Sequence, residues 1–112
     1  MQIDSLMKSD GPEIYYLDDF RNVLEDHMSY LRTHPATTTI QVEPMVAFKF
    51  EYDFYGLLQA LNVSPHLHWV VLRMNLLTGS TDYRRDMLYL WLPDFTVVEH
   101  IRQSHMSTRK IT

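Results

Sequence analysis

The six histidines and fourteen carboxylates are the side chains of this 112-residue chain best suited to acid–base or metal chemistry. His66 and His68 lie two positions apart, a spacing that brings imidazoles together on a strand but not on a helix, where positions four apart converge. Glu99 and His100 are adjacent, so on a helix they point in different directions. We therefore expect polar residues on helix surfaces here, with His68 packed against Trp69.

Other sequence signals of chemistry are absent. The three glycines are far apart and form no phosphate-binding loop, and no serine is flanked like a nucleophile elbow. The absence of cysteine excludes disulfides, thiolate catalysis and cysteine-bound zinc. We expect no catalytic residue, no metal site and no cofactor, and hence a protein that is not an enzyme.

The charge distribution points to protein partners. Apolar residues make up 46% of the chain and charged residues 21%, as in ordinary globular proteins. The formal charge of −4 is uneven: residues 1–53 carry ten acids and four bases, and residues 54–112 carry four acids and six bases. The sequence lacks the dense basic patch that would predict nucleic-acid binding. It also lacks a run of roughly 20 apolar residues that would predict a membrane span, and its N-terminus does not look like a signal peptide.

Apolar periodicity predicts the elements of the first half. Residues 14–33 carry an apolar stripe at helical spacing, formed by Leu17, Phe20, Leu24, Met28 and Leu31. The β-branched residues 37–42 predict a strand after Pro35. Residues 46–51 alternate between apolar and polar side chains, which favours a second strand over the start of a helix.

The second half predicts two short helices, a strand and a last helix. Asp53 can cap a helix over residues 54–61, and Ser64-Pro65 begins another that runs to Asn75. Residues 87–92 predict a buried strand. Asp94 then caps a helix that should fade near Ser104, with residues 106–112 as a tail.

The strand–helix–helix–strand order of residues 46–93 resembles a LysM module. Residues 53–64 are similar to the first helix of that family and the turn after it. Residues 67–75 are similar to its second helix, which characteristically ends in an asparagine, and residues 89–93 to its closing strand. The resemblance implies an α+β fold: a LysM-like β-α-α-β core with a small antiparallel sheet and two short helices, flanked by an N-terminal and a C-terminal helix.

Residues 66–75 are also similar to a segment of the baseplate wedge proteins of contractile-tailed bacteriophages. That segment is a short helix with leucine-histidine-tryptophan, then aliphatic residues and an asparagine; Phe54-Tyr55-Gly56 is similar to the tyrosine-glycine segment before it. The resemblance implies a structural protein of the virion tail baseplate, assembled in the host cytoplasm. It would join wedge and hub or tube proteins, without nucleic-acid or membrane partners.

The predicted division has three parts: an arm, helix and strand (residues 1–43), the LysM-like core (44–94), and the last helix and tail (95–112). Tyrosine loses little entropy on binding and can keep its hydroxyl hydrated. The candidate partner-interface residues are Tyr15, Tyr16, Tyr52, Tyr55 and Tyr83. The candidate core anchors are Trp69, Trp91, Leu58, Leu67 and Val71.

Two other functions remain open. The protein could be a peptidoglycan-binding LysM module, with Trp69 and Trp91 as sugar-stacking surfaces. Glycan contacts would then be expected at Tyr52-Asp53 and at residues 81–83, on the loops that follow the first strand and precede the last. It could also be a small tail-completion or connector protein.

Overall fold

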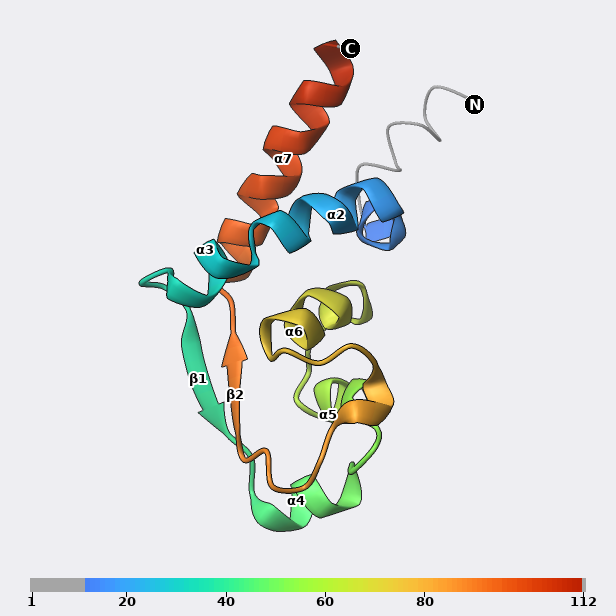
Figure 1. Ribbon diagram of the computed structural model, residues 1–112, viewed down its shortest axis with the longest axis vertical. Coiled ribbons are helices and arrows are strands. Elements are labelled where there is room, and N and C mark those ends of the chain that lie inside the picture. The colour runs from blue at the N-terminus through green and yellow to red at the C-terminus, as the bar shows by residue number, and fades with distance from the viewer. Residues whose placement is uncertain (1–11, 112) are drawn as a thin grey trace.

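The chain has an α+β fold in which short helices surround a two-stranded sheet (Figure 1). The computed structural model describes the backbone of residues 12–111 and the side chains of residues 13–106. The predicted arm, which is the part of residues 1–43 before the helix predicted from residue 14, lies outside the described residues except at its last positions. The elements in chain order are η1 (Pro12–Tyr16), α2 (Asp18–Asp26), α3 (Met28–Thr33), β1 (Thr38–Gln41), α4 (Pro44–Lys49), α5 (Phe54–Ala60), η2 (Pro65–Leu67), α6 (His68–Met74), η3 (Ser80–Asp82), β2 (Tyr89–Leu92) and α7 (Phe95–Ile111).

The sheet pairs β1 with β2 in antiparallel fashion, although almost fifty residues separate them. Ile40 lies opposite Leu90, and Thr39 lies opposite Trp91. Because side chains alternate along a strand, Ile40 and Leu90 face the core while Thr39 and Trp91 face outward. Both predicted strands that form this sheet are confirmed. The expectation that Trp91 anchors the core is wrong, because the pleat places it on the exposed face.

The predicted N-terminal helix is confirmed in outline, but it is divided at His27. Its Nδ1 atom lies 2.8 Å from the Val23 carbonyl, and its backbone leaves the helical region between α2 and α3. Phe20, Leu24, Met28 and Leu31 are buried as predicted, whereas Leu17 is exposed.

Arginine side chains fasten the N-terminal helices to α6. Arg32 donates hydrogen bonds to the carbonyls of Met74 (3.0 Å) and Arg73 (2.9 Å), at the C-terminal end of α6, where carbonyls lack helical partners. Arg73 in turn pairs with Glu25 of α2, and this hydrogen bond raises the pKa of Arg73 further above its usual value. The helix pair α2–α3 therefore closes one side of the core.

The strand predicted at residues 46–51 is wrong, because the chain forms helix α4 there. Pro44 occupies the first turn of the helix, where backbone N–H groups have no helical partner and the missing N–H of proline costs nothing. Glu43 before it is extended. Helix α4 buries only Ala47, and it leaves Phe48 exposed. The alternating pattern therefore did not reflect an alternation of buried and exposed side chains.

Helices α5 and α6 are confirmed. The Asp53 carboxylate accepts a hydrogen bond from the Gly56 N–H (3.0 Å) and caps α5, and a Cβ atom at position 56 would collide with that carboxylate. Leu58 and Val71 are fully buried core anchors, as predicted. Leu67 and Trp69 are half-buried and pack against this core.

The last helix is longer than predicted. Asp94 accepts a hydrogen bond from the Thr96 N–H (2.9 Å) near its start, and the helical backbone continues to Ile111. The predicted end near Ser104 and the tail from residue 106 are therefore wrong. Helix α7 lies beside α2 and then extends away from the sheet (Figure 1).

Candidate functional site

The five candidate interface tyrosines divide into two buried and three accessible side chains. Tyr15 and Tyr83 are 3% and 0% exposed, so the expectation that they lie on a partner surface is wrong for this conformation. The Tyr15 hydroxyl donates to Glu99 of α7 (2.8 Å), and burial together with this bond raises the pKa of Tyr15. The Tyr83 hydroxyl donates to the Met87 carbonyl (2.9 Å), and its ring lies 5.5 Å from Phe54.

Tyr16 and Tyr55 belong to one surface, which we call the Arg21 cluster: Tyr16, Arg21, Tyr55 and Trp69. The guanidinium of Arg21 lies 5.0 Å from the Trp69 ring and 5.7 Å from the Tyr16 ring. Its Nε atom donates to the Tyr15 carbonyl (2.9 Å), which fixes its position. A hollow of about 220 Å³ lies between these side chains. The arrangement offers aromatic walls and one cation to a partner side chain.

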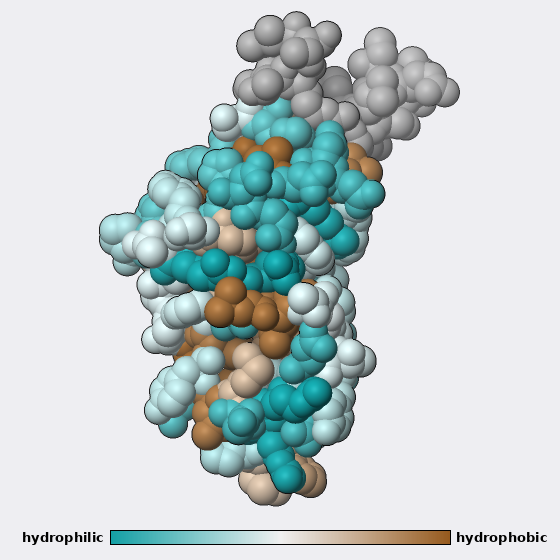
Figure 2. Space-filling view, in the orientation of Figure 1, coloured by the Kyte–Doolittle hydropathy of each residue, from teal (hydrophilic) through white to brown (hydrophobic). Residues whose placement is uncertain are grey.

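Tyr52 belongs to a second surface, the α4 surface: Met45, Phe48, Tyr52, Arg84 and Arg85. Met45, Phe48 and Tyr52 are 77%, 57% and 55% exposed. Apolar atoms are visible at the lower end of the molecule (Figure 2), where α4 lies in Figure 1. Arg84 lies over the Tyr52 ring (4.6 Å) and Arg85 over the Phe48 ring (5.4 Å). Aromatic, methionine and arginine side chains are the types enriched in protein interfaces.

The backbone of Tyr52 has an unusual conformation. Its φ angle is 67°, in the left-handed region that is costly for a bulky residue. The Tyr52 N–H donates to the Tyr83 carbonyl (2.8 Å), which holds this turn against the segment before β2. A glycine would adopt the same turn without steric cost.

Sequence reasoning missed most of the α4 surface. It identified Tyr52, but it assigned Phe48 to a strand and drew no inference from Met45 or the arginines. The available signal was Glu43-Pro44, a sequence that suits a helix start. A helix beginning there would place Met45 and Phe48 three positions apart on one face.

The paired histidines are structural. His68 is buried, its Nε2 atom lies 2.7 Å from the Val63 carbonyl, and its ring packs 5.5 Å from Tyr55. His66 is half-buried with its ring 5.0 Å from Tyr15, and this burial lowers the pKa of His66. Each imidazole therefore has a packing role near α6.

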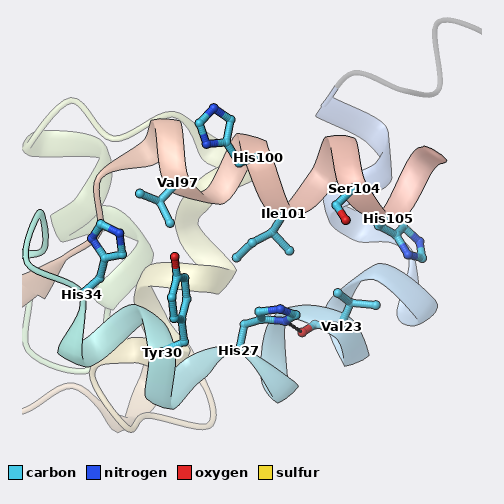
Figure 3. A pocket seen from close by; sticks show the side chains of 9 residues that line it. All are labelled: Val23, His27, Tyr30, His34, Val97, His100, Ile101, Ser104 and His105. Atoms are coloured by element: carbon cyan, nitrogen blue, oxygen red, sulfur yellow. Dashed lines mark hydrogen bonds between the residues drawn. The ribbon is translucent and has the colours of Figure 1, made fainter. Parts of the chain in front are cut away.

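The other four histidines line a groove between α3 and α7 (Figure 3). The groove has a volume of about 650 Å³ and an apolar floor that includes Val97 and Ile101. Figure 3 shows the imidazoles spread along the groove, with His100 pointing away from α3. Within the described residues, no group of three or more histidine or carboxylate side chains could hold a metal ion.

The two loops predicted to carry glycan contacts meet at the hydrogen bond between Tyr52 and Tyr83, and their two carboxylates are occupied. Asp53 caps α5, and the Asp82 carboxylate accepts hydrogen bonds from the N–H groups of Thr78 (3.1 Å) and Gly79 (3.0 Å). Bonds from Thr78, through its hydroxyl and its N–H, lower the pKa of Asp82 most, and Gly79 adds to the effect. Both carboxylates therefore hold turns of the backbone.

Asn75 connects the end of α6 to the edge of β2. Its Oδ1 atom accepts from the Trp91 N–H (2.8 Å), and its Nδ2 atom donates to the Trp91 carbonyl (3.0 Å). The same amide donates to the Val71 carbonyl (2.8 Å). The side chain thus supplies the two bonds that a neighbouring strand would make to Trp91.

Comparisons with protein families, curated proteins and solved structures found no match to this chain. Among the described residues, no helix is both long and apolar enough to cross a membrane.

Proposed function

We propose that this chain is a structural component of a contractile phage tail baseplate, with a LysM-like core that joins wedge and hub or tube proteins. The Asn75 bridge is the observation that supports the LysM-like core of this proposal. The LysM resemblance rests partly on an asparagine at the end of the second helix, and that residue makes the two hydrogen bonds between α6 and the closing strand.

The element order supports the proposal after one change. The first strand of the layout is β1, not residues 46–51, and it pairs with β2. The order β1, α5, α6, β2 is then strand–helix–helix–strand, with α4 inserted after the first strand. The inserted helix contributes exposed apolar surface rather than core.

Two aromatic surfaces support a role in assembly: the exposed α4 surface, and the Arg21 cluster, in which Tyr16 is exposed while Tyr55 and Trp69 are half-buried. Exposed clusters of aromatic side chains rimmed by arginine are typical of protein interfaces. The α4 surface and the Arg21 cluster are formed by different elements, so one chain could contact two neighbours.

The competing function is peptidoglycan binding. It is favoured by the meeting of the two predicted glycan loops at the hydrogen bond between Tyr52 and Tyr83. It is disfavoured by the burial of Tyr83 and by the structural use of Asp53 and Asp82. A tail-completion or connector role would use the same exposed surfaces.

A tagged full-length chain, purified from its native producing cells, tests the proposal. Mass spectrometry should identify tail-tube, hub or wedge proteins in fixed proportion. The variant Phe48→Ala should recover less of them, while the control Tyr30→Ala, which removes a comparably exposed ring away from the α4 surface, should recover the wild-type amount. Binding to purified cell-wall sacculi without recovery of tail proteins would establish the peptidoglycan-binding alternative instead.

A further inference from the structure

The two strands of the sheet each have an outer edge, and the register shows which groups lie there. Val42 N–H donates to the Leu88 carbonyl (2.7 Å), one step beyond the pair of Gln41 and Tyr89. Bonded and non-bonded pairs alternate in an antiparallel ladder. Ile40 is therefore bonded to β2, whereas the N–H and C=O groups of Thr39 and Gln41 point away from it.

The outer edge of β2 confirms this assignment of inward and outward backbone groups independently. Trp91 lies opposite Thr39, so the same alternation directs its N–H and C=O away from β1. Both groups are bonded to Asn75 on that side. At Trp91 the edge of β2 is therefore closed by a side chain.

The outer edge of β1 has no such closure. Thr39 and Gln41 are exposed, and none of the hydrogen bonds found in the described part of the chain joins their outward backbone groups to another element. Figure 1 places no helix or strand beyond β1 on this side. Strand edges are commonly protected by short length, a charge, proline or a bulge. Strand β1 is short, with four residues, but its sequence Thr-Thr-Ile-Gln contains no charge and no proline.

The outward N–H and C=O groups of Thr39 and Gln41 define the chemistry of a partner that could bind this edge. Two N–H donors and two C=O acceptors at alternate residues of one straight edge match an extended main chain. The half-buried Ile40 lies on the core-facing side of this edge, so alternate apolar side chains of an added strand would cover it.

We propose that the open edge of β1 accepts an extended segment of a neighbouring tail protein as a third strand of the sheet. This inference rests on the proposed function. A four-residue edge alone buries far less than the roughly 1,000 Å² that a stable, specific interface needs, so two copies paired through β1 alone would not be stable, and the added strand must come from a partner that also contacts another surface of the chain. In an assembly, contacts at the α4 surface or the Arg21 cluster would raise the local concentration of the added strand.

Amide hydrogen exchange tests the edge without any substitution. In the free full-length chain, the amides of Thr39 and Gln41 should exchange rapidly, and those of Ile40 and Val42 slowly. In the assembly purified through the tagged chain, Thr39 and Gln41 should become protected. Slow exchange at both positions in the free chain, or no protection in the assembly, would overturn the inference.

Proline variants test the same bonds by recovery. Thr39→Pro and Gln41→Pro each remove an outward N–H and leave the ladder with β2 complete, as tolerated on edge strands. Each should retain the wild-type circular dichroism spectrum and recover about tenfold less of the tail proteins. The matched control Thr39→Val keeps the N–H and the β-branched shape, so it should recover the wild-type amount.

The outcomes separate the two proposals. Recovery of tail proteins by wild type and proline variants alike would reject strand addition while leaving the proposed function intact. Failure of the wild-type chain to recover any tail protein would reject both. A dimer of the purified chain that Thr39→Pro abolishes, measured by sedimentation, would overturn the assignment by making a second copy the occupant.

Discussion

Helices α4 and α6 are both short and apolar, yet they use their side chains in opposite ways. Helix α6 buries five of its seven residues, and α4 buries one of its six. The difference comes from their surroundings, since α6 lies between α3, α5 and β2, whereas α4 stands at one end of the molecule. The composition of a short helix therefore does not decide its burial; the elements that cover it do.

The strongest test of this comparison removes core volume from α6. Leu72→Ala should lower the free energy of unfolding by about 2–5 kcal/mol, because Leu72 is fully buried and the substitution leaves a cavity. Phe48→Ala in α4 should change it by less than about 1 kcal/mol, because the exposed ring loses little more than its contact with Arg85. Urea denaturation of both variants measures their losses in free energy of unfolding. Equal losses would contradict the difference in burial between α6 and α4.

The next largest effect concerns the attachment of α6 to the sheet. Asn75→Ala should cost about 0.5–1.5 kcal/mol, since the N–H and C=O groups of Trp91 both exchange their partner for water. Asn75→Asp keeps an acceptor for the N–H but places a carboxylate oxygen against the carbonyls of Val71 and Trp91 at the C-terminal end of α6, so its loss in the same denaturation experiment should be at least as large. An Asn75→Ala variant as stable as wild type would show that α6 does not depend on this bridge.

A substitution at Tyr52, beside α4, should have a smaller effect on stability and of the opposite sign. Tyr52→Gly loses the contact with Arg84, but glycine adopts the observed φ without steric cost, so stability should be unchanged or rise by up to about 1 kcal/mol. Tyr52→Ala retains the strain and loses the contact with Arg84, so it should lose about 0.5–1 kcal/mol. Thermal unfolding compares the stabilities of the two variants. A glycine variant less stable than the alanine variant would contradict the prediction.

The smallest effect is a pH dependence at the contact between α7 and η1. Burial opposes ionisation of Glu99, but hydrogen bonds from Arg102 and Tyr15 outweigh it and lower the pKa of Glu99. A depressed pKa stabilises the fold above the unfolded value of about 4.3, and this stability is lost as the pH falls through the folded value. Tyr15→Phe should therefore lose less stability than wild type between pH 7 and pH 3. Urea denaturation at both pH values measures the difference, and an unchanged or larger loss would contradict it.

The sequence was sufficient to predict elements that bury a regular apolar stripe. Leu24 and Leu31 in the N-terminal helices, and Leu57 and Val71 in α5 and α6, are all buried. Periodicity reports burial, so it succeeded where one face of an element is covered by the core.

The same reasoning explains the errors. Helix α4 has no buried stripe to detect, because only Ala47 is covered, and so its apolar side chains suggested a strand. In β2, an unbroken apolar run hid the alternation that exposes Trp91 and buries Leu90. Of the candidate site, sequence identified Tyr16, Tyr52 and Tyr55 as residues. It could not pair them with Arg21 or Arg84, because those contacts depend on tertiary structure.

Helix α7 and helix α4 mark opposite ends of the long axis of the molecule (Figure 1), which measures 47 Å against 31 and 20 Å for the other two axes. A chain of this form can act as a spacer. If one neighbour contacts α4 and another contacts the far end of α7, the long dimension of the folded molecule sets the distance between the two neighbours at about 47 Å. Insertion or deletion of helical turns in α7 would then change a dimension of the assembly by about 5.4 Å per turn, without altering either contact.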